Sequence, residues 1–156
     1  MKNLIGLDKA KAYELSGMLN QLLADYQVFY QNLRGLHWNI KGKEFFELHL
    51  KFEEFYDDAV IKIDEIAERI LTLGQRPNHK FSIYLKNTSI TETNEVSDGP
   101  KSLQEILNAF SILLTKQRLI LGLSDEIDDE GTNALMSDYI REQEKLVWMY
   151  SAYLKK

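Results

Sequence analysis

Two of the three histidines in this chain, His37 and His49, lie twelve residues apart within one short stretch, GLHWNIKGKEFFELH. An acidic amphipathic stretch follows it and carries Glu53, Asp64 and Glu68. Imidazole nitrogens combined with carboxylate oxygens suit a redox-active ion such as iron(II), whereas calcium and magnesium prefer shells made of oxygen alone. The residue types therefore predict a transition-metal site with coordination positions left open.

The composition limits the classes of protein that the chain can belong to. Its 156 residues are enough for one domain, 1–156, that buries a core without disulfides. The absence of cysteine excludes thiolate ligands and thiol catalysis. Because no apolar run reaches about 18 residues and the N-terminus lacks signal-peptide features, we expect a cytoplasmic protein without a membrane span. The net charge of −5 argues against a broad nucleic-acid surface.

Four long helices are predicted from apolar residues that recur every three or four positions. They cover about residues 8–32 and 44–73, a third segment that starts after residue 100, and a fourth from near residue 132 to the C-terminus. Asp8 is the predicted N-cap of the first helix, and Ser102 with Glu105 is a predicted capping box for the third. Gly74 and Pro77 are expected to end the second helix.

The lengths of the connections predict the topology. About ten residues join the first two helices and a short acidic turn joins the last two, so we expect each pair to be antiparallel. The longer connection, residues 75–101, can cross the length of a bundle and has room for a short helix. One long crossover between two helical hairpins is the ferritin-like form of the four-helix bundle, so we predict an all-α fold of this kind.

The candidate ligands share one face of the second helix but not one place along it. With about 100° of rotation per residue, Glu53 lies about 40° round from His49, and the two later acids lie within about 100° of it. A rise of about 1.5 Å per residue, however, separates His49 from Asp64 by roughly 22 Å along the axis. Asp64 and Glu68 can share an ion, but the histidines cannot reach it within one chain.

Two-fold symmetry reconciles the two ends of this helix. If the second helices of two copies pack antiparallel, the histidine end of one chain meets the carboxylate end of the other. Such packing creates two identical sites, each with His37 and His49 from one subunit and the later carboxylates from its mate. The sequence thus predicts an iron site shared between subunits.

This constellation resembles the signature of the Dps family, the mini-ferritins named as DNA-binding proteins from starved cells. The resemblance rests on residues 32–77, with the His37-Trp38 pair, a second histidine twelve residues later, and Asp64 and Glu68 within DEIAERI. The ending EKLVWMYSAYL also resembles the last helix of the family, so the similarity covers nearly the whole chain. No Glu lies three residues before any histidine, which disfavours the E-x-x-H site of larger ferritins.

The resemblance implies a hollow homo-dodecamer, built from two-fold dimers, that is a ferroxidase and stores ferric iron. It implies iron bound between subunits by His37, His49, Asp64 and Glu68, with hydrogen peroxide as the preferred oxidant and oxygen as the other. Consuming iron(II) and peroxide together would protect the cell and its DNA. Two other functions stay open, namely a DNA-compacting, nucleoid-associated protein with little ferroxidase activity and a bundle that serves only to oligomerise.

Each candidate residue also has a structural interpretation. A single histidine near a helix start is commonly a capping or packing residue. The two later carboxylates could pair with Lys62 or Arg69 on a solvated helix face. Glu53 stands where many family members carry Asp, and it could bind iron, contact the mineral or be surface charge. Trp38 would lie beside the site in this family, as an electron donor or as interface packing.

The turn SDEIDDEG, residues 124–131, concentrates acids before the last helix. A constriction with negative charge raises the local concentration of cations. In the family the start of this helix lines three-fold channels, so the resemblance implies Asp125, Asp129 and Glu130 as candidate residues of an iron-uptake pore. The alternative is that Asp128 or Asp129 caps the helix, where acids also complement the helix dipole.

DNA binding is the family property against which this sequence argues. Twelve subunits at −5 would carry a formal charge of −60. The terminal segments hold few lysines, namely Lys2, Lys9, Lys11, Lys155 and Lys156. Because DNA affinity depends on neutralising phosphates, we predict weak or no binding, and a gel shift at about 0.15 M salt without divalent metal should show free DNA. Stable complexes in that gel would contradict the prediction.

Overall fold

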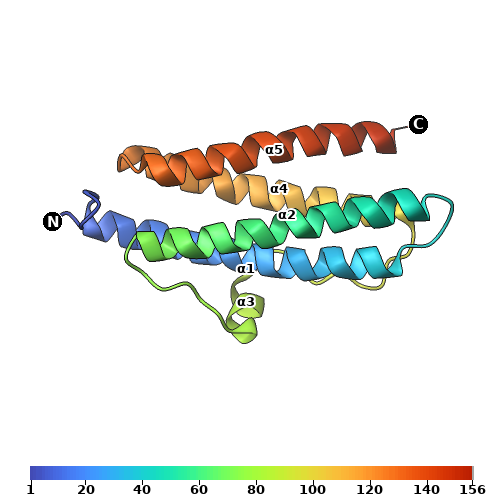
Figure 1. Cartoon of the computed structure of the whole chain (residues 1–156), viewed down its shortest axis with the longest axis horizontal. Helices are drawn as coiled ribbons and strands as arrows, with labels where there is room; N and C mark the ends of the chain where they lie inside the picture. Colours follow the sequence, from blue (N-terminus) through green and yellow to red (C-terminus); the bar gives the residue numbers. More distant parts are fainter. Residues whose placement is uncertain (156) are drawn as a thin grey trace.

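The computed structural model describes residues 1–155 as helices joined by turns and one long crossover (Figure 1). In chain order the described helices are α1 (Lys9–Asn39), α2 (Phe45–Thr72), α3 (Phe81–Asn87), α4 (Gly99–Glu126) and α5 (Glu130–Leu154). The α1–α2 and α4–α5 pairs are antiparallel hairpins, and α3 lies in the crossover between them. The predicted all-α architecture, with its short crossover helix, is confirmed.

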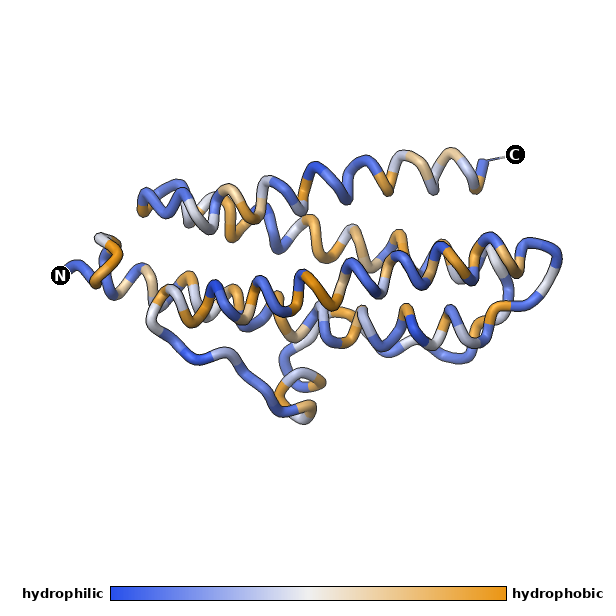
Figure 2. The backbone as a smooth tube through the Cα atoms, in the orientation of Figure 1, coloured by the Kyte–Doolittle hydropathy of each residue, from blue (hydrophilic) through white to orange (hydrophobic). Residues whose placement is uncertain are grey.

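The core lies between the four long helices. Apolar and polar residues alternate along each of them with the helical period (Figure 2), which turns one apolar face inward. Phe110 of α4 meets Phe29 of α1 and Phe55 of α2 edge to face, with ring centroids 5.4 Å and 5.7 Å apart. Each such buried side chain contributes about 1.5–3 kcal/mol to folding, so this cluster binds the two hairpins together.

A closed ring of hydrogen bonds crosses the core. The Tyr26 hydroxyl donates to Gln117 Oε1 at 2.5 Å, and Gln117 Nε2 donates to Gln143 Oε1 at 2.7 Å. Gln143 Nε2 closes the ring by donating to the Tyr26 oxygen at 2.6 Å. Burial raises the pKa of Tyr26, so the hydroxyl stays protonated and can donate. Because each buried side chain both donates and accepts, the ring fixes how α1, α4 and α5 meet.

The first helix is longer than predicted. It continues past the predicted end at residue 32 to Asn39, so the predicted boundary is wrong. Leu33 and Leu36 are buried, and their burial offsets the cost of about 1 kcal/mol for Gly35 inside a helix. The α1–α2 connection is therefore five residues rather than about ten, and His37 lies in the last turn of α1.

The start of α4 also differs from the prediction, whereas Asp8 caps α1 as predicted. The side chain of Asp98 caps α4 by accepting a hydrogen bond from the Lys101 amide at 2.9 Å. Ser102 donates its hydroxyl to the Asp98 carbonyl at 2.8 Å, so it is not an N-cap and the predicted capping box is wrong. Pro100 fits the first turn because its missing N–H would have no partner there.

Helix α4 is the one helix in residues 1–155 with a length and composition that would suit a membrane span. Its apolar residues Leu103, Ile106, Phe110 and Leu113 are buried in this structure. Helices α1 and α5 pack against α4, and Phe110 also meets Phe55 of α2. The bundle core therefore accounts for part of the apolar character of the helix, since a third of its most apolar window is buried.

Asp25, fully buried on α1, anchors the crossover. Its Oδ1 accepts from the Ser89 amide at 2.6 Å and from the Thr88 hydroxyl at 3.0 Å. Its Oδ2 lies 2.5 Å from Nζ of Lys116 on α4. One carboxylate thus joins α1, α4 and the chain that follows α3.

Replacing Asp25 by Asn should destabilise the fold, because the partly buried Lys116 ammonium loses its counter-charge. We expect a loss of about 3 kcal/mol in the free energy of unfolding. Glu144→Gln is the matched control, since Glu144 pairs with Arg118 at 3.0 Å on the surface and should cost less than about 1 kcal/mol. Urea denaturation followed by circular dichroism measures both, and equal losses would contradict the anchoring role.

Candidate metal centre

The last turn of α1 and the first turns of α2 bring the two histidines together. The rings of His37 and His49 stack with their centroids 3.7 Å apart and their planes 14° from parallel. Phe45, one helical turn before His49, stacks on that ring with a centroid distance of 4.8 Å. The chain reverses direction within these twelve residues, and the reversal places His49 beside His37.

Each imidazole is held by the backbone of the other histidine. His37 Nδ1 donates to the His49 carbonyl oxygen at 2.5 Å, and His49 Nδ1 donates to the His37 carbonyl oxygen at 2.8 Å. A carbonyl oxygen can only accept, so both Nδ1 atoms carry a proton, and in the neutral rings both Nε2 atoms keep a lone pair. Metal-binding histidines are commonly oriented by such a bond from the other ring nitrogen.

The His37 carbonyl is free to accept because α1 ends two residues later. The last carbonyls of a helix have no intrahelical donor. In a longer helix the Lys41 amide would bond to His37, but here it donates to the Ser97 carbonyl at 2.9 Å. The end of α1 therefore supplies the acceptor that orients His49.

Aromatic and acidic side chains surround the histidine pair. The ring of Tyr56 meets the ring of His37 edge to face, with centroids 5.3 Å apart. Partial burial raises the pKa of Tyr56, and the negative charge of Glu53 raises it further. Tyr56 is thus neutral near neutral pH, and half-buried Glu53, one turn after His49, supplies negative charge on the same face.

Trp38 follows His37 in the chain but faces solvent. Its side chain is 57% exposed, and the Arg34 guanidinium lies over its ring at 5.0 Å. A large exposed aromatic residue beside a candidate site is suited to contact with another subunit. Its role as an electron donor stays a prediction.

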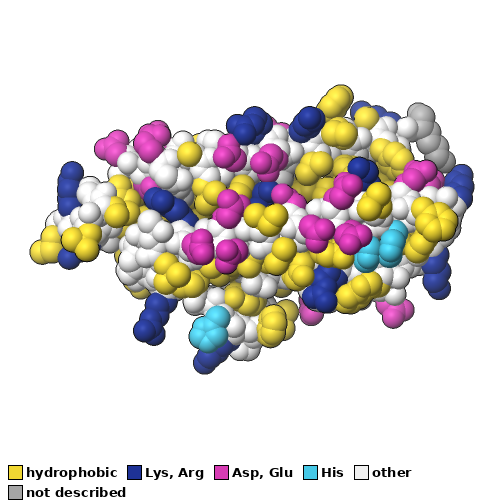
Figure 3. Space-filling model, in the orientation of Figure 1, with side chains coloured by type: hydrophobic (Ala, Val, Ile, Leu, Met, Phe, Trp, Pro, Cys, Tyr) yellow, Lys and Arg dark blue, Asp and Glu magenta, His cyan; other side chains and the backbone are white. Residues whose placement is uncertain are grey.

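Asp64 and Glu68 lie near the other end of α2, and both side chains are exposed. Figure 3 shows acidic side chains spread along the visible face of the bundle, with histidine near one end. Among the ion pairs of residues 1–155, Lys62 and Arg69 bind other acids and neither Asp64 nor Glu68 takes part. Both carboxylates are therefore available to bind a cation.

Within the described chain, no three His, Asp or Glu side chains gather closely enough to hold a metal ion. The histidine end and the carboxylate end of α2 each present only part of a ligand set. We call these two parts the histidine half-site, His37 and His49, and the carboxylate half-site, Asp64 and Glu68. Their assignment as iron ligands stays a prediction.

Asp129 differs from the other two predicted pore acids. It is 2% exposed, and its Oδ1 accepts hydrogen bonds from the Thr132 amide at 3.1 Å and from Arg69 at 2.6 Å. These contacts confirm the alternative that Asp129 is the N-cap of α5, and its burial and pairing argue against the pore role, which stays a prediction. Asp125 and Glu130 are exposed and stay predicted pore residues.

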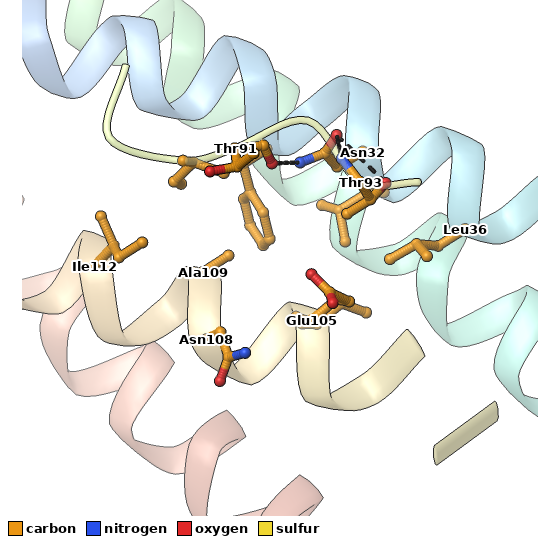
Figure 4. Close-up of a pocket in the computed structure, with 12 residues that line it drawn as sticks. Asn32, Leu36, Thr91, Thr93, Glu105, Asn108, Ala109 and Ile112 are labelled. Atoms are coloured by element: carbon orange, nitrogen blue, oxygen red, sulfur yellow. Dashed lines mark hydrogen bonds between the residues drawn. The ribbon is translucent and has the colours of Figure 1, made fainter. Parts of the chain in front are cut away.

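A separate cavity of about 200 Å³ lies between α1, α4 and the crossover (Figure 4). Asn32 donates to the Thr91 carbonyl at 3.0 Å and accepts from the Thr93 amide at 3.0 Å. Glu105 of α4 is the single carboxylate among the residues that line this cavity. Because no candidate ligand lines it, the cavity is not part of the centre.

Known proteins match this chain along its length. Residues 17–156 match the family model of the ferritin-like domain. The crystal structure of a Dps protein from Vibrio cholerae O1 superposes with a TM-score of 0.97 at 63% identity, covering 99% of this chain and 97% of that one. The chain belongs to the Dps family of ferritin-like proteins.

Two curated relatives cover similar lengths of this Dps chain. The DNA protection during starvation protein of Porphyromonas gingivalis is 44% identical over 97% of this chain and 95% of its own length. An uncharacterised protein of Haemophilus influenzae is 55% identical over 97% of this chain and 94% of its own length. These alignments span both half-sites.

Three contacts of the histidine pair were not predicted from the sequence, namely the stack with Phe45 and the two hydrogen bonds to backbone carbonyls. Phe45 lies four residues before His49 and so on the same helix face, and that spacing could have revealed the stack. No residue pattern in the sequence indicates the hydrogen bonds between the histidines and the carbonyls. These bonds depend on the position at which α1 ends, and that position was predicted wrongly.

The carbonyl contacts predict the tautomers of the histidines. In the metal-free protein the neutral rings of His37 and His49 should both carry their proton on Nδ1. Exposed His79 should exchange between tautomers. Magic-angle-spinning ¹⁵N NMR of protein labelled only at its three histidines can measure this. A protonated Nε2 at either member of the pair would contradict the assignment.

Proposed function

We propose that this Dps protein is a ferroxidase that oxidises iron(II) at sites shared between subunits and stores the ferric product inside a hollow homo-dodecamer. The observation that carries the proposal is the stacked histidine pair with both Nδ1 atoms bonded to backbone carbonyls. Neutral imidazoles at one end of α2 complement unpaired carboxylates at the other. The ferritin-like match and the Dps relatives support this reading.

The surface of α2 supports a two-fold dimer as the unit that completes each site. Phe46, Leu50, Ile61 and Leu71 of α2 are each more than half exposed in the single chain. Large apolar side chains along one exposed helix favour contact with another protein. An antiparallel partner helix would cover this apolar surface and bring each histidine half-site to the carboxylate half-site of its mate.

Iron is the substrate in this proposal, and hydrogen peroxide is the preferred oxidant. Each peroxide takes one electron from each of two iron(II) ions and, with two protons, becomes two waters, so no hydroxyl radical is released. The His37 and His49 Nε2 atoms would bind iron, while Asp64 and Glu68 favour the more highly charged ferric product by Coulomb attraction. Glu53 would add negative charge beside the histidines, and Trp38 would donate an electron when one iron(II) is missing.

Iron uptake through the shell is proposed at the turn between α4 and α5. Asp125 and Glu130 are exposed there, and their charges would attract cations toward a channel between subunits. The charge of Asp129 is already neutralised by Arg69 at 2.6 Å. The negative electrostatic potential at the turn would therefore come mainly from Asp125 and Glu130.

Under this proposal, iron oxidation protects DNA even though the protein does not bind it. Several curated relatives carry the name DNA protection during starvation protein. Removing iron(II) and peroxide takes away the reactants that form hydroxyl radicals. A net charge of −5 per chain favours this route over compaction of DNA, the second candidate function. DNA retention without peroxide-dependent iron oxidation would instead support compaction.

Mixing two inactive variants tests the shared site. Homo-oligomers of His37→Ala and of Asp64→Ala should each oxidise iron(II) at least about tenfold more slowly. In a mixed dimer one of the two sites joins intact halves, so random co-assembly should restore about a quarter of the wild-type sites. Absorbance of the ferric product, with peroxide and with oxygen, measures the rates.

His79→Ala, a loop histidine outside both half-sites, is the matched control and should oxidise iron at the wild-type rate. Co-assembly must be verified, for instance by mass spectrometry of differently tagged subunits. If verified mixed particles recover nothing above the single variants, the intersubunit site is ruled out.

A further inference from the structure

The C-terminal end of α2 is fastened to the start of α5 by Arg69. Its Nη2 donates to Asp129 Oδ1 at 2.6 Å, and its Nε donates to Thr132 Oγ1 at 2.8 Å. The side chains of Arg69 and Asp129 are 20% and 2% exposed, so solvent screens this charge-assisted bond less than it screens a surface pair. We call these contacts the Arg69 clamp.

Gly131 provides the space that the clamp occupies. A Cβ atom at this position would lie 2.6 Å from Nη1, 2.7 Å from Nη2 and 2.8 Å from Cζ of Arg69. Any side chain at position 131 would therefore displace the Arg69 guanidinium from these contacts. Because the guanidinium is the far end of a flexible side chain, it can move away while both helices remain.

The clamp lies next to the carboxylate half-site. Arg69 directly follows Glu68, and Asp64 lies five residues before Arg69. The end of α2 and the start of α5 lie at the same end of the bundle (Figure 1). Glu68 lies one turn and Asp64 about two turns before the end of α2 at Thr72, and helix ends tend to fray because part of their hydrogen bonding is missing. Both carboxylate side chains are exposed, so other side chains must hold this end of the helix in place.

We infer that Arg69 is a positioning residue for metal binding. By fixing the last turns of α2 to the capped start of α5, it holds Asp64 and Glu68 in the orientation that a cation shared with another subunit requires. The inference rests on the proposed function, because it takes these carboxylates as ligands. Arg69 itself does not touch the ion.

Gly131→Ala tests the inference without removing a charge. Gly122→Ala is the matched control, since it makes the same replacement within a helix and a Cβ at position 122 of α4 meets nothing within 4 Å. Cobalt(II), whose visible spectrum reports binding, is titrated into the assembled metal-free protein. We expect Gly131→Ala to bind cobalt about tenfold more weakly and Gly122→Ala to bind like the wild type.

Kinetics separate positioning from general loss of structure. For Gly131→Ala the KM for iron(II) should rise by about the same tenfold factor, while kcat at saturating iron stays within about twofold. Arg69→Lys keeps the charge but cannot make both clamp bonds, so its cobalt affinity should fall between those of the wild type and Gly131→Ala.

Unchanged cobalt affinity in Gly131→Ala, with the displaced guanidinium verified in a crystal structure, would overturn the inference. Wild-type affinity in Arg69→Lys would also overturn it, because charge alone would then suffice. His37→Ala, titrated in parallel, identifies a failure of the proposed function. If that variant binds cobalt like the wild type, no shared site exists, and the inference falls with it.

Discussion

Asp64 follows His49 by fifteen residues on one uninterrupted helix. The proposed site between two subunits depends on that separation. A straight helix holds the two side chains roughly 22 Å apart along its axis, which no rotamer can bridge. A ligand set divided in this way can be completed only by a second chain. Under the proposed arrangement, assembly and activity are therefore coupled, because an isolated subunit holds two half-sites and no complete one.

Helix ends provide the contacts that hold His49 and Arg69 in place. The His37 carbonyl accepts from His49 because it belongs to the last turn of α1, where no backbone donor remains. At the other end of the bundle, Asp129 caps α5 with the same oxygen that receives Arg69. In both places a backbone group left open by the end of a helix, or the residue that caps it, holds a side chain distant in sequence.

Within residues 1–155, the interior of the bundle offers no metal site of its own, which fits a proposed site outside the core. Ferritin-like bundles can hold metal between their helices with inward-facing carboxylates and histidines. Here Tyr26, Gln117 and Gln143 occupy the middle of the core and satisfy one another in a closed ring. Neutral groups that are already paired offer a cation little, whereas the candidate ligands lie outside this ring, with His37 buried at the end of α1 and Asp64 and Glu68 exposed on α2.

The sequence by itself determined the fold class and the types and separation of the candidate ligands, because apolar periodicity and helical rise are properties of the local chain. It misjudged the end of α1, since burial of Leu33 and Leu36 overrides the propensity of Gly35. Only the tertiary structure decided the histidine tautomers and the burial of Asp129. These depend on partners such as Arg69, sixty residues from Asp129, which only the packing of α2 against α5 brings within hydrogen-bonding distance.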